Sequence, residues 1–204
     1  MRFTPGCVYH IYNRGNNKQT IFFISENYQF FLQKIKTQLL PVCEILCWCL
    51  MPNHFHLMIY TTEKSCAERK SFGGKPMQEL AYRIGIMLNS YSQAINKQNH
   101  TTGSLFQQKT KAKCLACPED QIRIATEKQY ILTCMKYIHQ NPQKANLVQR
   151  QEDWNYFSFR EYMGMNTILP CNRQLMEELT GFSGRDFYLE SNGWIRDEEI
   201  DDIW

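Results

Sequence analysis

Two histidines, His54 and His56, are separated by one residue in the run HFHLMIY. The aromatic and aliphatic residues of this run predict a strand over residues 54–60. Residues two apart on a strand point to the same side of a sheet, so we expect the two imidazoles side by side while Phe55 packs into the core. Two neutral imidazoles at this spacing can chelate one divalent cation. The alternative is chance adjacency with no metal bound.

Tyr137 and Asn141 are four residues apart at the end of a predicted helix and therefore share a helical face. A tyrosine can act as a nucleophile that forms a covalent intermediate, and an Asn amide oxygen can bind a hard cation. The alternative is that Tyr137 packs in the core and Asn141 accompanies Pro142 as a helix stop. Because burial raises the pKa of a phenol, which is already about 10, we expect Tyr137 to be partly exposed and near the metal.

A second tyrosine, Tyr130, lies seven residues earlier on the same predicted helix and on a similar face. The residue four positions after it is Cys134, whereas Tyr137 is followed at that spacing by Asn141. A hard cation prefers an amide oxygen to a thiol, so Tyr137 is a better candidate than Tyr130 for a nucleophile beside a metal. His139 points to the other side of the helix and is assigned no part in proton transfer.

Basic residues alternate in the segment LFQQKTKAK, residues 105–113, which predicts a short extended element. On a strand, Lys109, Lys111 and Lys113 would line one face. Arg14 ends another predicted strand that also carries aromatic residues. Alternating basic and aromatic side chains suit the backbone and bases of a single-stranded nucleic acid. The alternative is an edge strand that lysines protect from pairing with other chains.

The remaining pattern predicts the elements that would position these residues. We expect strands over 8–14, 44–51, 54–60 and 105–113, and helices over 26–40, 77–98 and 118–141, with Ser25 capping the first helix. Pro52-Asn53 would connect a hairpin, Pro142 would end the last helix, and the polar segment 61–75 would be a loop. This order predicts an α+β fold with an antiparallel sheet and helices on one or both faces.

The overall composition is that of a globular protein of 204 residues, with 43% hydrophobic and 21% charged residues. It excludes wholesale disorder and collagen-like structure. The longest strongly apolar run, residues 45–51, is too short to cross a bilayer, and the start lacks the apolar segment of a signal peptide. We therefore expect a cytoplasmic protein with no membrane partner.

Charge is unevenly distributed along the chain, although the net formal charge is only +3. Residues 176–204 carry nine acidic and two basic residues, a charge of −7, which leaves 21 basic and 11 acidic residues, +10, for residues 1–175. A basic body with an acidic tail suits a polyanionic partner. The alternative is that the charged faces serve only solubility.

The nine cysteines are an odd number without an export signal, which predicts reduced thiols. Cys114 and Cys117 have C-x-x-C spacing. A structural zinc site would need two more ligands at matching spacing, and no second clean pair comes from the other candidates, Cys43, Cys47, Cys49 and Cys134. We therefore expect most of the cysteines to be small buried hydrophobic residues.

Several of these segments together resemble a known family. MPNHFHLMI is similar to the signature strand of the single-tyrosine HUH transposases, in the repeat-associated (REP-associated) tyrosine transposase branch. The resemblance continues, in the family's order, through YHIYNRGNN, GSLFQQKTKAK, KYIHQNPQKANLV and WNYFSFREY, and covers roughly residues 5–163. The chain departs from the family around residues 61–76, in the acidic tail, and in KTKAK, where relatives usually have an arginine-containing stretch.

The resemblance implies a ferredoxin-like core with a central antiparallel sheet, in a catalytic domain over 1–163 followed by an acidic extension over 164–204. It implies Mg²⁺ or Mn²⁺ bound by His54, His56 and Asn141, and Tyr137 as the nucleophile that forms a 5′-phosphotyrosine. The implied substrate is single-stranded DNA that contains hairpins, and a monomer and a homodimer are both compatible with it. The DNA contacts are expected from the basic residues already described, Arg14, Lys109, Lys111 and Lys113.

Three functions remain open at this point. The first is a transposase that cleaves and joins single-stranded DNA. The second is a non-catalytic nucleic-acid-binding relic of the same fold, and the third is a metal-dependent hydrolase that uses the histidine pair and a water nucleophile. The presence of His54, His56, Tyr137 and Asn141 favours the first function over the second. A covalent protein–DNA adduct would separate the first from the third.

Overall fold

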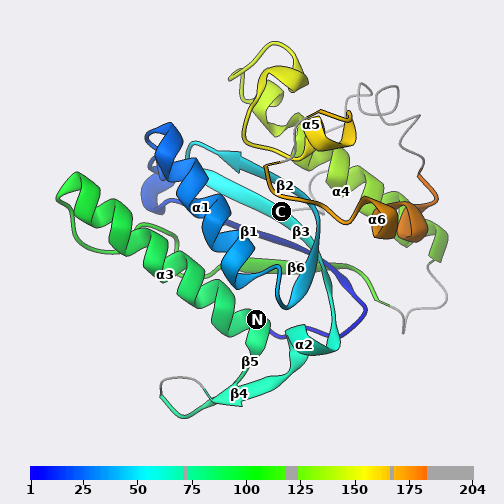
Figure 1. Cartoon of the computed structure of the whole chain (residues 1–204), viewed down its shortest axis with the longest axis horizontal. Helices are drawn as coiled ribbons and strands as arrows, with labels where there is room; N and C mark the ends of the chain where they lie inside the picture. The colour runs from blue at the N-terminus through cyan, green and yellow to red at the C-terminus, as the bar shows by residue number, and fades with distance from the viewer. Residues whose placement is uncertain (71–72, 118–123, 166–167, 183–204) are drawn as a thin grey trace.

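A four-stranded antiparallel sheet forms the centre of the protein (Figure 1). The computed structural model describes residues 1–70, 73–117, 124–165 and 168–182. The strands lie in the order β2-β3-β1-β6, and all neighbours are antiparallel. Their bounds are Val8–Arg14 for β1, Cys43–Met51 for β2, His54–Thr61 for β3 and Lys111–Ala116 for β6. With α1, Ser25–Gln38, after β1 and α3, Glu79–Asn99, after β3, the chain follows the βαββαβ path of a ferredoxin-like core, as expected.

The register of the sheet brings the histidine pair to the end of β1. The hairpin of β2 and β3 pairs Met51 with His54 across the two predicted turn residues. Strand β1 pairs with β3 so that Arg14 lies opposite His54 and Tyr12 lies opposite His56. Residues that lie directly opposite each other in an antiparallel pair point to the same face, so all four side chains belong to one side of the sheet.

Helices cover both faces of the sheet, so both faces are buried. On one side, Phe55, Leu57 and Ile59 of β3 belong to the same apolar cluster as Phe31 of α1 and Tyr91 of α3. On the other side lies α4, Ile124–Lys144, together with the shorter α5, Phe159–Tyr162, and α6, Arg173–Thr180. This second cluster contains side chains from β2, β3 and α4, among them Cys47, Cys49, Met58, Met135 and Ile138.

Helix α4 differs from its prediction at its end, because it continues past Pro142 to Lys144. Proline removes one backbone N–H, but only two residues follow it in the helix. The final turn is closed by other amides: the N–H of Ala145 donates to the carbonyl of Asn141, and the N–H of Leu147 donates to that of Pro142. Residues 118–123, where we predicted the start of this helix, lie outside the described residues.

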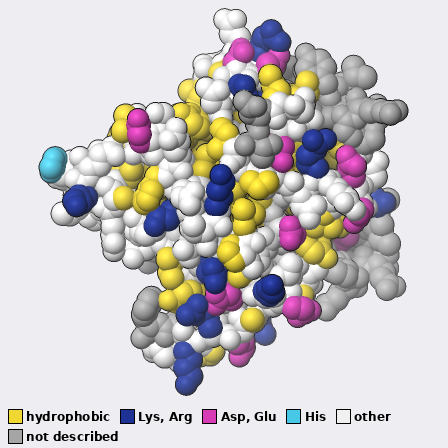
Figure 2. Space-filling view, in the orientation of Figure 1, with side chains coloured by type: hydrophobic (Ala, Val, Ile, Leu, Met, Phe, Trp, Pro, Cys, Tyr) yellow, Lys and Arg dark blue, Asp and Glu magenta, His cyan; other side chains and the backbone are white. Residues whose placement is uncertain are grey.

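The segment predicted as a loop over 61–75 contains regular structure. Helix α2, Glu63–Cys66, is followed by β4, Glu68–Lys70, which pairs with β5, Pro76–Gln78. A salt bridge of 2.9 Å joins Arg69 to Glu79 at the start of α3. These short strands are largely exposed, and β4 is made of charged residues, so they lack the apolar alternation that reveals a strand in a sequence. Lys and Arg side chains gather around this hairpin on the face seen in Figure 2.

Two further boundaries depart from the predictions. The strand expected over 105–113 starts at Lys111, so Lys109 precedes it. Helix α1 has Ile24 rather than Ser25 at its N-cap position, and Asn27 Oδ1 accepts from the amides of Phe23 and Ile24. Single 3₁₀ turns occur at Asn16–Lys18 (η1) and Gln151–Asp153 (η2).

The described part of the segment after residue 163 packs against the core. Leu169 and Met176 are fully buried, and the Asn172 side chain caps α6 by accepting from the Leu175 amide. Residues 183–204, which include most of the predicted acidic tail, lie outside the described residues. Among the described helices, none combines the length and apolar character needed to cross a membrane.

Candidate nucleophile and metal-binding site

The histidine pair lies on one side of β3, as the alternation predicts. The ring centroids of His54 and His56 are 4.9 Å apart, and the two planes are nearly perpendicular. Helix α4 covers this side, so His54 is 6% exposed and His56 is fully buried. Burial, with the nearby Arg14 charge, lowers the pKa of His54 to about 4, although a hydrogen bond with the Asn141 side chain acts in the opposite direction. Burial also lowers the pKa of His56 well below its usual value, so both imidazoles are neutral at pH 7.

A third histidine, His10, belongs to the site and was missed in the sequence. Its Nε2 lies 2.9 Å from Nδ1 of His56, and both rings are buried. Because Nδ1 of His56 is engaged in this hydrogen bond, coordination of a metal by His56 would use Nε2. The signal was present in VYHIYNR, where His10 alternates with Tyr12 and Arg14 on the strand that pairs with the histidine run.

The candidate nucleophile, Tyr137, comes from α4 and lies over the histidines of the sheet. Its ring centroid is 5.5 Å from that of His56 and 6.4 Å from that of His10. One turn later, Nδ2 of Asn141 donates to the Tyr137 carbonyl at 2.9 Å. The Asn141 side chain also takes part in hydrogen bonds that affect the pKa values of His54 and Tyr137. The four residues singled out in the sequence therefore converge in space.

The expectation that Tyr137 is partly exposed is wrong, because its side chain is only 4% exposed. Tyr137 belongs to the apolar cluster between α4 and β2, a consequence of α4 lying directly on the histidine face. Burial raises the pKa of Tyr137 above its usual value of 10. The Asn141 hydrogen bond and the Arg14 charge act in the opposite direction.

Tyr130 and His139, the two other α4 residues considered in the sequence, make contacts of different kinds. The Lys113 ammonium lies 5.6 Å from the centre of the Tyr130 ring, which places Tyr130 beside β6. His139 Nε2 lies 2.8 Å from Ser158 Oγ, and its ring contacts Phe157 and Phe159. Tyr130 also interacts electrostatically with Tyr12, so it borders the histidine face, and the choice of Tyr137 over Tyr130 stays a prediction.

Three of the four predicted basic residues border this face of the sheet. Arg14 is half-buried at the end of β1 opposite His54, and its charge contributes to the pKa values of His54, His56 and Tyr137. On β6, Lys111 pairs with Tyr12 and Lys113 pairs with His10, so both lysines share the histidine face. Lys109 is exposed and lies before the strand, so the predicted row of three lysines is reduced to two.

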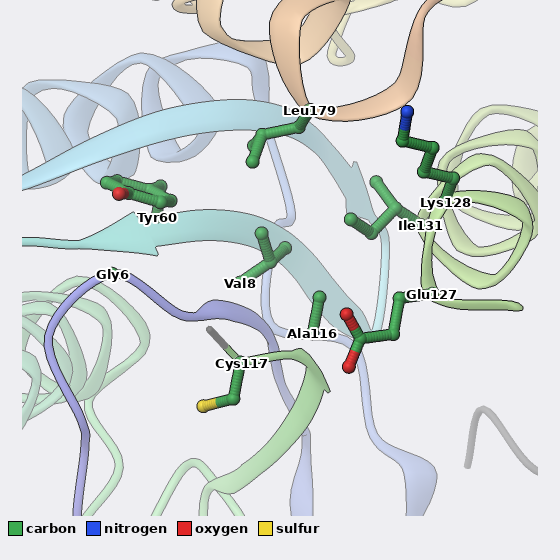
Figure 3. A pocket seen from close by; sticks show the side chains of 9 residues that line it. All are labelled: Gly6, Val8, Tyr60, Ala116, Cys117, Glu127, Lys128, Ile131 and Leu179. Carbon is green, nitrogen blue, oxygen red and sulfur yellow. The ribbon is translucent and has the colours of Figure 1, made fainter. Parts of the chain in front are cut away.

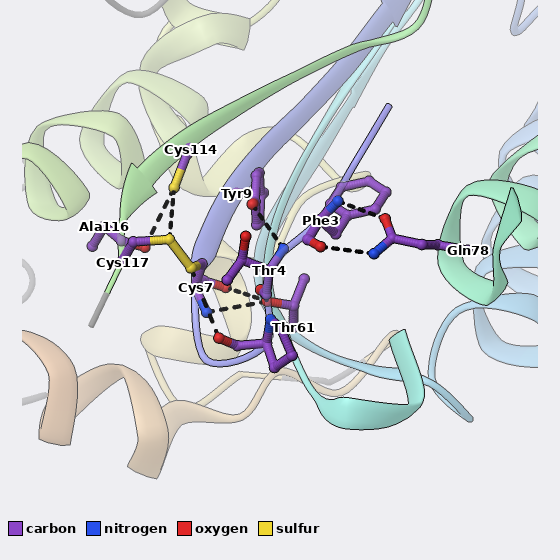
Figure 4. The surroundings of a disulfide bond; sticks show 10 residues. Phe3, Thr4, Cys7, Tyr9, Thr61, Gln78, Cys114, Ala116 and Cys117 are labelled. Atoms are coloured by element: carbon purple, nitrogen blue, oxygen red, sulfur yellow. Dashed lines mark hydrogen bonds between the residues drawn. A yellow bond between two sulfur atoms is a disulfide. The ribbon is translucent and has the colours of Figure 1, made fainter. Parts of the chain in front are cut away.

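The cysteines differ from their prediction in one respect. Cys43, Cys47, Cys49 and Cys134 are buried, as expected. Cys7 and Cys117, however, form a disulfide, which contradicts the expectation of reduced thiols throughout (Figure 4). The two residues are 110 positions apart in the chain, so spacing gave no sign of this bond.

The comparisons with known proteins add a fold relationship. No protein-family model matches the chain, and no curated protein matches it either. Among solved structures, the chain is similar to a REP-associated tyrosine transposase bound to a REP hairpin, with a TM-score of 0.58 and 16% sequence identity. The match covers 84% of this chain and 89% of the other. At this level of identity the likeness shows a shared fold.

Proposed function

We propose that the protein cleaves and rejoins single-stranded DNA that contains a hairpin, with Tyr137 as the nucleophile. The observation that carries the proposal is the placement of Tyr137 over the histidine pair, with 5.5 Å between the ring centroids of Tyr137 and His56. Asn141, one turn later, interacts with the side chains of both Tyr137 and His54. The shared fold with a hairpin-bound transposase supports the same reading.

The donor set suits a divalent cation of the Mg²⁺ or Mn²⁺ type. We assign its binding to His54, His56 and the amide oxygen of Asn141, with His10 orienting His56 through Nδ1. Mn²⁺ accepts this mixture of nitrogen and oxygen ligands more readily than Mg²⁺, which prefers oxygen. When bound, such a cation would offset the negative charge that develops on the scissile phosphate.

The chain's own residues would carry out the transfer. Tyr137 loses its phenolic proton as Oη attacks the phosphorus, the bond from phosphorus to the 3′-oxygen breaks, and the leaving 3′-oxygen takes up a proton, so the step consumes no net proton. The resulting 5′-phosphotyrosine keeps the energy of the phosphodiester, so a later 3′-hydroxyl can reverse the step and join DNA. Arg14, whose charge already favours ionisation of Tyr137, is placed to hold the phosphate, while Lys111 and Lys113 would contact the backbone.

The burial of Tyr137 bears on this proposal in two ways. Tyr137 is only 4% exposed, so the reaction requires a rearrangement that uncovers its hydroxyl, such as a displacement of α4 from the sheet. The same burial favours a second candidate, a metal-dependent hydrolase in which the histidines serve a water nucleophile and Tyr137 only packs. The two candidates differ in whether the enzyme becomes covalently attached to DNA.

The deciding experiment uses a DNA hairpin with a single-stranded flank, labelled at its 3′ end, incubated with the full chain and Mn²⁺. The 3′ label stays on the fragment that carries the 5′-phosphate. We therefore expect a labelled species that migrates with the protein on a denaturing gel. Cleavage without this adduct would support the hydrolase instead. Neither cleavage nor adduct would support a non-catalytic nucleic-acid-binding protein.

Two matched variants identify the nucleophile. Tyr137→Phe keeps the ring that packs against His56 and removes only the hydroxyl, so it should remain folded and bind the hairpin but form no adduct. Tyr130→Phe, on the same helix, should form the adduct as the unmodified chain does. The opposite pattern would assign the reaction to Tyr130.

A further inference from the structure

Three cysteine sulfurs meet at the end of the sheet away from Arg14 and His54. Cys7 precedes β1, Cys114 lies on β6, and Cys117 follows β6 directly. Their sulfur atoms all lie within 4.8 Å of one another, and those of Cys114 and Cys117 are 3.5 Å apart (Figure 4). The disulfide joins only Cys7 and Cys117. Cross-linking β1 to β6 therefore does not explain why the sulfur of Cys114 lies beside them.

Backbone hydrogen bonds to β3 and the pairing of β1 with β6 fix the positions of these three residues. The amide of Cys7 donates to Thr61 Oγ1 at 3.1 Å, and its carbonyl accepts from the Thr61 amide at 3.0 Å. On β6 the register shifts, so that Val8 pairs with Ala116 but Tyr9 pairs with Cys114.

This irregularity brings the C-x-x-C pair together. In a regular strand, residues three apart point to opposite faces. Leu115 is the extra residue of this bulge, and a bulge changes the direction of the side chains next to it. The strand then ends at Ala116. The sulfurs of Cys114 and Cys117 can therefore meet on the side where Cys7 lies.

We propose that, with the Cys7–Cys117 bond reduced, Cys7, Cys114 and Cys117 bind one thiophilic cation of the Zn²⁺ class. Two-electron reduction by a dithiol or phosphine breaks the sulfur–sulfur bond and yields two thiols, while the reductant is oxidised. Cation binding then releases the thiol protons to solvent. With zinc–sulfur bonds of about 2.3 Å, tetrahedral ligands lie roughly 3.8 Å apart. The sulfur atoms of Cys114 and Cys117, 3.5 Å apart, are close to this distance. All three sulfur atoms lie within 4.8 Å of one another, which is compatible with a shared cation.

The surroundings give the cation a way in and leave room for a fourth ligand. Cys114 is exposed and Cys117 is half-buried, whereas Cys7 is fully buried. Cys117 also borders a pocket of about 280 Å³ formed with α4 and α6 (Figure 3). Among the described residues, the cluster contains no fourth His, Cys, Asp or Glu ligand, so solvent would occupy the last position. A cation here would fasten the edge strand β6 to β1, at the opposite end from the histidine site.

Cobalt provides a direct test, because thiolate-bound Co²⁺ has charge-transfer absorption that histidine and carboxylate sites lack. The full chain, reduced with a phosphine and freed of metal, should develop this absorption to one equivalent and lose it when Zn²⁺ is added. Cys114→Ser, at an exposed position, should weaken binding by about tenfold or more, because changes in outer-shell partners alone cost that much. Cys66→Ser, at a half-buried thiol outside the cluster, should bind as the unmodified chain does.

Three further measurements complete the test. His54→Ala/His56→Ala should leave the thiolate absorption of bound Co²⁺ unchanged, because the histidine site is separate and gives no such absorption. Mapping of alkylation by mass spectrometry, on the unmodified chain, should show that Zn²⁺ protects Cys7, Cys114 and Cys117 but not Cys66. Protein kept oxidised, with its disulfide intact, should bind no Co²⁺ at this site. Absence of thiolate absorption in the reduced chain, or an unchanged titration of Cys114→Ser, would overturn the proposal.

Discussion

The two sides of strand β3 are equally buried and yet chemically opposite. Phe55, Leu57 and Ile59 face α1 and α3 and belong to an apolar cluster. His54 and His56 face α4, beside Tyr137. The comparison teaches that burial does not separate structural positions from candidate functional ones in this fold. What separates them is that α4, among its apolar side chains, also brings Tyr137 and Asn141 to the sheet.

The two sides also differ in what they contribute to stability. Apolar burial stabilises the fold without the need for specific partners. Buried imidazoles are costly unless they are hydrogen-bonded, and here the bonds run from His56 to His10 and from His54 to Asn53. We therefore expect changes on the α1 and α3 side to lower stability, and changes on the α4 side to affect chemistry first.

The largest expected effect comes from the histidine side. His54→Ala/His56→Ala should reduce Mn²⁺-dependent cleavage of hairpin DNA to background, because both imidazole ligands are lost. Stability should fall by about 1–3 kcal/mol, since the variant also removes the hydrogen bond between His56 and His10. Gel assays and urea denaturation on the same preparation measure both quantities. Metal-dependent cleavage by a folded double variant would contradict the assigned ligands.

On the opposite side of the same strand, Phe55→Ala should lower the free energy of unfolding by about 3–5 kcal/mol. Phe55 is fully buried against Phe31 and Phe106, so truncation leaves a cavity in the apolar cluster. At temperatures where the variant stays folded, it should still form the DNA adduct. If adduct formation were lost while circular dichroism showed a folded protein, the division between the two sides would be wrong.

The sequence predicts this division in part, because alternation along a strand is a local property. The bounds of β1 and the connection between β2 and β3 follow from local residue types, and both were confirmed. The placement of His54 and His56 on one face also follows from a two-residue period. Tyr137 and Asn141 share a face because they are one helical turn apart, which is local as well.

What the sequence could not reveal depends on which elements meet in space. The burial of Tyr137 arises because α4 packs on the histidine face, and no pattern within α4 states which surface it covers. His10 joins the site through strand pairing across 46 residues. Cys7 reaches Cys117 across 110 residues, and the cluster also needs the register shift around Leu115. Each of these is a long-range contact with no fixed sequence spacing.

An intermediate effect is expected at His10, which sharpens the comparison on the α4 side. His10→Ala should weaken Mn²⁺ binding about 10- to 100-fold, because loss of an outer partner frees the orientation of a ligating imidazole. His10→Gln, which retains a hydrogen-bonding group towards Nδ1 of His56, should recover part of the affinity. Calorimetric titration measures both variants. Equal affinities for the two variants would show that His10 only fills space.

The smallest effect is expected at the edge of the histidine face, where Lys111 and Lys113 lie on β6. Each lysine that neutralises a phosphate of single-stranded DNA displaces about 0.7 of a counterion, so Lys111→Gln and Lys113→Gln should each reduce the salt dependence of hairpin binding by roughly that amount. Lys113 is half-buried and its ammonium lies over the ring of Tyr130, whereas Lys111 is exposed, so the Lys111 change should leave stability unaltered.

Lys97→Gln, at an exposed position near the end of α3, serves as the control and should leave the slope unchanged. Binding measured by fluorescence anisotropy across a salt series gives the slopes directly. If Lys97→Gln lowered the slope as much as the β6 variants do, DNA would bind over the whole basic surface rather than along the face that carries the histidines.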